Sequence, residues 1–90
     1  MLYSMFNRSE KELKRDEEFV VSVKAEVGKI GMQSALEDYF NERYEKKLGP
    51  MSISYDEEMK DWVVTTPDKK VRVEYVESIP KAVQELLLKK

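Results

Sequence analysis

The chain contains no cysteine and no histidine, and this double absence restricts its chemistry more than any other property of its composition. Histidine-based triads, cysteine nucleophiles and the usual zinc, iron–sulfur or haem sites all need an imidazole or a thiolate. Without disulfides, a core built from only 90 residues must stabilise the fold alone. We therefore expect no cofactor and no enzymatic activity, and the sequence assigns no catalytic, cofactor-binding or metal-binding residue.

The chain also lacks a long apolar run and an excess of one charge. No stretch approaches the roughly 20 apolar residues that span a bilayer. The 16 basic and 18 acidic side chains give a net charge of −2, which is divided evenly between residues 1–49 and 50–90. Because proteins that bind nucleic acid through its phosphates are usually basic, this balance favours protein as the partner. The first residues lack the basic start of a secretion signal. We expect a cytoplasmic protein with no membrane contact.

The first part of the chain predicts a helix over residues 9–30. Ser9 and Glu12 have the spacing of a capping box, and the charged run 10–18 consists mainly of helix-favouring residues. Residues 19–27 fit two patterns, because they alternate as a strand does and also continue the apolar stripe of a helix. We interpret them as helix, and a strand at 19–27 stays the alternative.

A second helix is predicted over residues 34–48. Ser34 and Glu37 repeat the capping-box spacing, and apolar residues then recur with a helical rhythm as far as Leu48. Gly49 follows as a typical helix terminator. Because the connection to the first helix is short, we expect the two to pack as an antiparallel hairpin.

The second half of the sequence changes to the two-residue period of strands. Apolar and polar residues alternate over residues 51–55, 61–65 and 71–75, with turn-forming loops between them. Ser78 is placed to cap a last helix, with Pro80 in its first turn. The predicted fold is a single α+β domain over residues 1–90: a helical hairpin, a three-stranded antiparallel meander and a C-terminal helix, α-α-β-β-β-α.

Four acidic residues cluster between the first two predicted strands. They are Asp56, Glu57, Glu58 and Asp61. Converging carboxylates bind Mg²⁺ or Ca²⁺, but the alternating acids and central glycine of a calcium-binding loop are missing. We interpret the cluster as a solvated loop.

Nine aromatic residues are many for the core of so short a chain. Aromatic side chains are enriched at protein interfaces, so the surplus predicts a shared surface. The interface candidates are Leu2, Tyr3, Phe6, Tyr39, Tyr44 and Trp62. The segment Leu2–Phe6 is open to three interpretations: a short strand, a core segment or an interface. The sequence thus predicts a protein-binding module of the regulatory or accessory kind, which binds another protein or forms a homodimer.

A nucleic-acid-binding module is the alternative function. The motif Gly28-Lys29-Ile30-Gly31 lies between the two predicted helices, and such a G-x-x-G turn lets the backbone approach the phosphates of a single strand. Basic residues also gather at the tip of the second hairpin. The candidate contacts are Lys29 in the Gly28–Gly31 loop, or Lys69, Lys70 and Arg72 at the hairpin tip.

Overall fold

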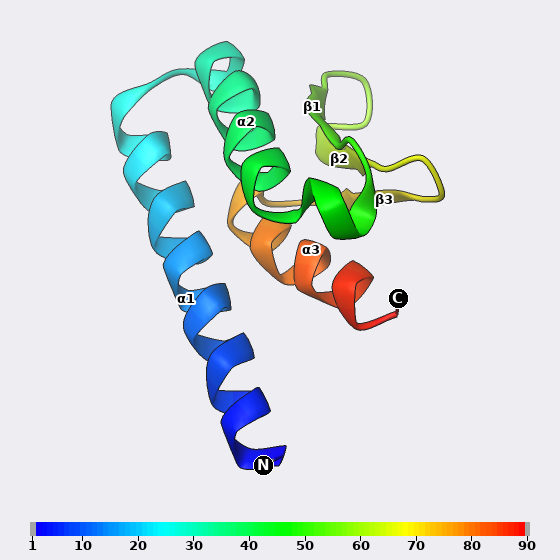
Figure 1. The fold of residues 1–90 in the computed structure, drawn as a ribbon. Coiled ribbons are helices and arrows are strands. Elements are labelled where there is room, and N and C mark those ends of the chain that lie inside the picture. Colours follow the sequence, from blue (N-terminus) through cyan, green and yellow to red (C-terminus); the bar gives the residue numbers. More distant parts are fainter. Residues whose placement is uncertain (1, 90) are drawn as a thin grey trace.

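The chain adopts the predicted order of elements, α-α-β-β-β-α, which confirms the α+β fold class. The computed structural model describes the backbone of residues 2–89 and the side chains of residues 10–89. The elements are α1 (Leu2–Glu26), α2 (Lys29–Leu48), β1 (Ser52–Asp56), β2 (Asp61–Thr65), β3 (Lys70–Val73), the 3₁₀ turn η1 (Val76–Ser78) and α3 (Ile79–Leu88). Figure 1 shows α1 and α2 as a helical pair, with α3 beneath α2 and the sheet beside it.

The long first helix confirms the helical interpretation of residues 19–26, excludes two alternatives that the sequence left open and corrects the predicted helix start. Residues 19–27 do not form a strand, because α1 continues to Glu26 and the chain then bends. The burial follows the helix: Val20 is fully buried, whereas its neighbour Val21 is 58% exposed. The helix also begins at Leu2, so the short strand at Leu2–Phe6 is wrong and Ser9 lies inside the helix instead of capping it. No glycine or proline interrupts residues 2–26, and an uninterrupted run of helix formers propagates past a local capping signal.

The break between the helices is shorter than predicted. α2 begins at Lys29, five residues before Ser34, and Gly28 is its N-cap residue with an extended backbone. The Gly28 carbonyl accepts a hydrogen bond from the Met32 N–H (2.8 Å) and so starts the helix. Gly31 therefore lies in the first turn of α2, and a Cβ there would stand only 3.1 Å from Cβ of Val27. The missing side chain allows the tight turn between α1 and α2.

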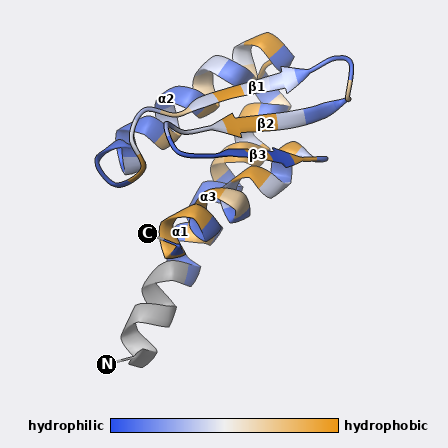
Figure 2. Cartoon of the chain, turned by 90° about the vertical axis from the view of Figure 1, so that its right-hand side faces the viewer, coloured by the Kyte–Doolittle hydropathy of each residue, from blue (hydrophilic) through white to orange (hydrophobic). Residues whose placement is uncertain are grey.

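The three strands form an antiparallel sheet in the order β1-β2-β3. Ile53 lies opposite Val64, and Val64 lies opposite Val71. These residues share the inner face, which the helices cover, whereas the opposite face is turned toward the viewer in Figure 2. β3 ends at Val73, so Tyr75 lies beyond the strand and is 62% exposed.

The core lies between α2 and the inner face of the sheet. Phe40 and Leu36 of α2 are completely buried, as is Val64 of β2. The other members of the core cluster are Val20, Val23, Met32, Tyr44, Leu48, Met51, Ile53, Trp62, Val76, Ile79, Val83 and Leu86. All three helices contribute to this list, so a single cluster joins the helical pair, the sheet and α3.

The last helix begins where predicted but without the predicted cap. Ser78 occupies the N-cap position of α3, yet its side chain makes no capping hydrogen bond. Instead, η1 leads into the helix, and the Ser78 N–H bonds to the carbonyl of Tyr75 (3.0 Å). Ile79 and Pro80 in the first turn are fully buried. Burial of this turn therefore fixes the start of α3.

Candidate interaction surface

One face of α1 carries a repeat of alternating three- and four-residue steps. Its members, which we call the seam of α1, are Leu2, Phe6, Ser9, Leu13, Asp16, Val20 and Val23. This spacing keeps one stripe of a helix turned toward a neighbouring helix, as in a coiled coil. The seam is mainly apolar, so most of its length favours contact with another surface.

The rest of the molecule covers the C-terminal part of the seam. Val20 and Asp16 are fully buried and Val23 is 9% exposed, whereas Leu13 is half-buried. We call α2, the sheet, η1 and α3 together the body.

Asp16 fixes the buried part of α1 to α2. Its carboxylate accepts hydrogen bonds from the hydroxyls of Tyr39 and Tyr44, each at 2.6 Å, and forms an ion pair with Nε of Arg43 at 3.2 Å. Nε2 of Gln84 in α3 donates to the Tyr44 hydroxyl at 3.3 Å. No buried side-chain polar atom among the described residues lacks a partner. The network therefore satisfies a buried charge while connecting three helices.

The network also holds its two tyrosines in the neutral form. Burial, followed by the hydrogen bond to Asp16, raises the pKa of Tyr39 from 10.0 to about 12. The same two causes raise the pKa of Tyr44 to about 12. A phenolate beside a carboxylate would place two negative charges within hydrogen-bonding distance. Because both tyrosine hydroxyls donate to Asp16, the arrangement is a structural contact that holds α1 against α2.

A groove of about 290 Å³ opens between α1 and α3 beside Leu13. We call it the α1–α3 groove, and it is lined by Glu10, Leu13, Lys81, Gln84, Glu85 and Leu88. The atoms that line it are mainly apolar. Leu88 is 77% exposed, although leucine is among the residues most often buried. The groove therefore offers aliphatic surface directly beside the seam position Leu13.

The aromatic interface candidates of α2 and β2 lie mainly inside the fold. Tyr44 and Trp62 are each 4% exposed and belong to the core. Tyr39 is half-buried, and its ring stacks on that of Phe19 with 3.9 Å between the centroids. Their burial leaves little free surface on the side chains themselves.

The N-terminal candidates Leu2, Tyr3 and Phe6 have side chains that lie outside the described residues. Their backbone belongs to α1. The sequence places Leu2 and Phe6, but not Tyr3, on the seam.

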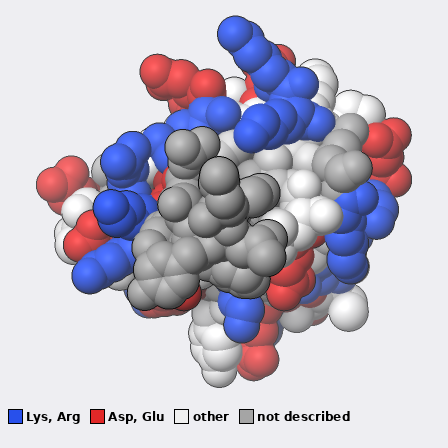
Figure 3. All heavy atoms as spheres, turned by 60° about the horizontal axis from the view of Figure 1, so that its bottom comes forward, with Lys and Arg blue, Asp and Glu red and all other residues white. Residues whose placement is uncertain are grey.

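The basic candidates do not converge on one surface. Nζ of Lys29 lies 3.9 Å from the centroid of the Tyr55 ring, a cation–π contact at the β1–β2 end of the sheet. Lys69 and Lys70 are exposed at the opposite end, in the β2–β3 turn. Tyr55 pairs with Trp62 and Lys70 pairs with Thr65, so the two places are three residues apart along β2. At the rise of an antiparallel strand, this is a distance of roughly 10 Å. Figure 3 shows basic and acidic side chains interspersed on the face that it views.

Arg72 is already paired. Its Nη1 bonds to Asp61 Oδ1 at 2.9 Å and to Asp56 Oδ2 at 3.1 Å, across the outer face of the sheet. Asp56 Oδ1 also accepts the backbone N–H groups of Glu58 and Met59. Asp56 and Asp61 of the acidic cluster are therefore bonded within the turn and to Arg72. Among the described residues, no group of three acidic side chains is placed to hold a metal ion.

Side chains of α2 cover part of the open edge of β1. The Asn41 amide donates to the Met51 carbonyl (2.9 Å) and accepts the Met51 N–H (2.7 Å). One turn earlier, Glu37 Oε1 accepts the Ile53 N–H at 3.0 Å. An edge strand normally leaves such groups free to pair with another chain. Here the backbone N–H and carbonyl of Met51, just before β1, and the N–H of Ile53 find partners within the chain.

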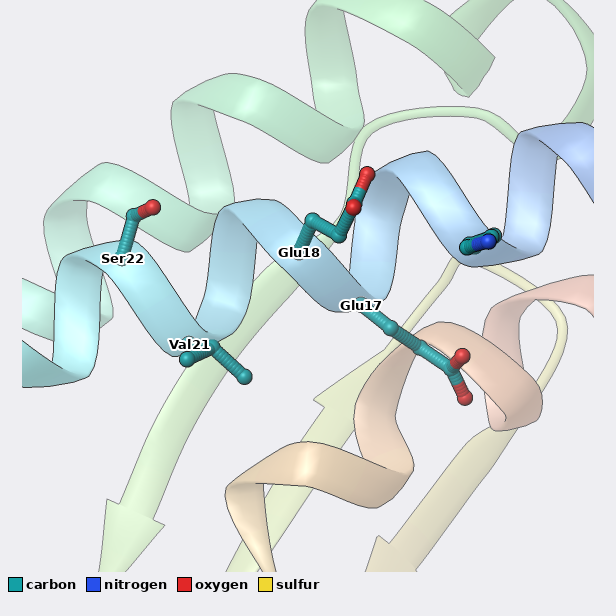
Figure 4. A pocket seen from close by; sticks show the side chains of 5 residues that line it. Glu17, Glu18, Val21 and Ser22 are labelled. Carbon is teal, nitrogen blue, oxygen red and sulfur yellow. The ribbon is translucent and has the colours of Figure 1, made fainter.

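A hollow on α1 differs from the groove because only one element forms it. It is lined by Lys14, Glu17, Glu18, Val21 and Ser22, all from α1. Figure 4 shows Glu17 and Val21 on one side of the helix and Glu18 and Ser22 on the other. With no second wall, the hollow is the ordinary exposed surface of a helix.

Two further findings bear on function. No helix in the described part of the chain combines the length and apolarity needed to cross a membrane. No protein-family model, curated protein or solved structure matches the chain.

Proposed function

We propose that this chain is a small, non-enzymatic protein-binding module of the regulatory or accessory kind, whose α1–α3 groove accepts an amphipathic helix. The observation that supports it is the apolar groove itself, in which Leu88 stands 77% exposed beside Leu13. Apolar side chains gathered in a groove mark a site where a partner's apolar face is buried. The absence of cysteine suits a reducing compartment, so we place the protein in the cytoplasm.

The rim of the groove supports a helix as the partner. Glu10 and Glu85 carry negative charge, and Lys81 carries positive charge, around an apolar floor. An amphipathic helix has the matching design, because its apolar stripe is flanked by charged residues. Charges on the rim set the orientation and the rate of association more than the affinity.

Photo-crosslinking from the groove tests this function. A benzoylphenylalanine at position 88 is compared with one at position 21, since Leu88 and Val21 are both exposed aliphatic residues, at 77% and 58%. We expect position 88 to label a defined protein partner in cell extract and position 21 to give little product. The labelled peptide should come from a helix with an apolar stripe. Equal labelling from both positions, or none from position 88, contradicts the proposal.

Nucleic-acid binding at the β2–β3 turn is the second candidate function. Lys69 and Lys70 favour it because both are exposed there. Replacing both by glutamine should abolish a shift of labelled RNA or DNA at low salt, whereas Lys46→Gln/Lys47→Gln, an exposed lysine pair at the end of α2, should not. Absence of any salt-dependent shift by the unmodified protein excludes this candidate.

A further inference from the structure

We infer that the outer edge of β3, the side that points away from β2, is a second binding surface. It takes an extended segment of another protein, in which acidic and apolar residues alternate, as a fourth antiparallel strand. The inference goes beyond the proposed function, because it uses neither the α1–α3 groove nor a helix as the partner. Figure 2 shows β1 and β3 as the two borders of the sheet. Among the described strands, β3 pairs with β2 alone.

The direction of the backbone groups of β3 follows from the hydrogen bonds of the neighbouring strands. The Ile53 N–H bonds to a side chain of α2, so the backbone groups of Ile53 point away from β2. Its partner Val64 therefore turns its own groups toward β3, where it lies opposite Val71. Because backbone groups alternate in direction along a strand, those of Lys70 and Arg72 point to the outer edge.

These outward groups are available to another strand. Among the described residues, no hydrogen bond reaches the outward N–H and carbonyl of Lys70 or Arg72. The start of β1 differs, since the side chains of Asn41 and Glu37 bond to backbone groups there. An extended segment beside β3 would pair with both N–H groups and both carbonyls, and pairing of this kind is a recurring mode of peptide recognition.

The inner face of β3 calls for apolar residues in the added strand. Val71 and Val73 are only half-buried, whereas Val64 and Trp62, which lie opposite them on β2, are 0% and 4% exposed. The two valines remain half-buried because β3 is the last strand on this side. Residues of a fourth strand that lie opposite them would share the inner face and cover them.

The outer face of β3 favours an acidic residue. Residues of the added strand opposite Lys70 and Arg72 would stand on this face, where opposite charges across two strands attract. Arg72 already bonds to two aspartates, so the exposed Lys70, next to the exposed Lys69, supplies the selective charge. Glu74 follows β3 at its other end, so the acidic preference is strongest opposite Lys70.

A synthetic peptide of about eight alternating glutamate and valine residues tests the inference, because a strand of ordinary length is five to six residues. In titrations followed by amide NMR, the signals of Lys70 and Arg72 should shift and their hydrogen exchange should slow. The contact is far smaller than the roughly 800 Å² per partner of a stable complex, so we expect a dissociation constant of about 1 mM.

N-methylated forms of the same peptide provide matched controls. In an antiparallel pair, the glutamates opposite Lys70 and Arg72 exchange both backbone hydrogen bonds with them. N-methylation of the glutamates removes these donors and should weaken binding at least about tenfold. N-methylation of the valines alters the far edge of the peptide and should leave binding nearly unchanged.

A charge exchange tests the selectivity. Lys70→Glu should weaken binding of the acidic peptide at least about tenfold and strengthen that of a peptide with lysine in place of glutamate. Lys46→Glu, at an exposed lysine near the end of α2, is the matched control and should change neither. Both positions are exposed, so circular dichroism should show an intact fold for both variants.

Several outcomes overturn the inference. These are equal binding of the two N-methylated peptides, or no shift at Lys70 and Arg72 up to about 5 mM peptide, five times the expected dissociation constant. Shifts at β3 that grow with the concentration of the chain alone indicate pairing between two copies instead. Binding of an RNA oligonucleotide but not the peptide assigns Lys70 to the nucleic-acid candidate. Shifts confined to Leu13 and Leu88 place the peptide in the α1–α3 groove, so the proposed function then stands without this inference.

Discussion

Replacing Asp16 by alanine tests how α1 is held against the body. The carboxylate is completely buried and has three partners, the hydroxyls of Tyr39 and Tyr44 and the guanidinium of Arg43. Removing one member of a buried charge network typically costs about 3–5 kcal/mol. Arg43 is 24% exposed and can turn toward water, and Tyr39 is half-buried, so we expect the lower end, about 3 kcal/mol. That is a large part of the stability of a domain of this size.

Two milder variants separate the contribution of the Asp16 charge to the free energy of unfolding from that of a single hydrogen bond. Asp16→Asn keeps the shape and one acceptor oxygen but removes the charge, and we expect a loss of about 1–2 kcal/mol. Tyr44→Phe removes one buried donor and leaves Asp16 bonded to Tyr39 and Arg43, for a loss of about 1.5–3 kcal/mol. Because Asp16 and Tyr44 share one hydrogen bond, the double variant should lose less than the two single losses added together.

Urea denaturation followed by circular dichroism measures these free energies of unfolding. The midpoint should decrease while the slope of free energy against urea stays constant, since the surface exposed on unfolding is unchanged. Leu13→Ala, at the half-buried seam position one turn earlier, is a comparison that removes apolar contact but no charge. A loss below about 1 kcal/mol for Asp16→Ala refutes the view that this network holds the helices together.

Three other predictions follow from single contacts. Because the pKa of Tyr39 and Tyr44 is about 12 in the fold and 10.0 unperturbed, stability should hold below pH 10 and fall between pH 10 and about 12; a flat urea midpoint across that range contradicts it. Gly49→Ala should cost about 1–3 kcal/mol, since φ is +81° and a Cβ would lie 2.9 Å from Pro67; an unchanged midpoint contradicts this. Asn41→Ala should cost about 2–4 kcal/mol, because both backbone groups of the buried Met51 lose their partner, and it should speed amide exchange at Met51; unchanged exchange would count against the bidentate contact.

The periodicity of the sequence predicted the elements well because it reflects burial directly. Alternation located all three strands, and the covered side of α2 has the helical rhythm of Leu36, Phe40 and Tyr44. The predicted starts of the first two helices were wrong because a capping box is a local signal. Ser9 and Ser34 have the right spacing, but the residues before them also favour helix, and α1 and α2 already begin at Leu2 and Lys29.

The candidate surface was harder to predict from sequence. Asp16 lies within a charged run, where nothing local separates a buried carboxylate from its exposed neighbours. Only its place in the three–four spacing indicates burial. Leu88 belongs to an apolar helix end, and its exposure depends on where α1 lies against α3. Whether Trp62 and Tyr44 are buried or exposed likewise depends on tertiary packing, because an aromatic residue suits a core and an interface equally well.

The contacts of Asn41 and Glu37 with β1 have a consequence for the unfolding of this chain. While α2 is docked, these two side chains bond to backbone groups at the start of this edge, where a neighbouring strand would otherwise pair, and so hinder strand addition there. Detachment of α2 uncovers the edge and the apolar inner face of the sheet in one event. To fold without aggregating, the chain must therefore dock α2 on the sheet before it meets another partly folded chain. Conditions that loosen the helical pair should thus promote aggregation before the sheet itself melts.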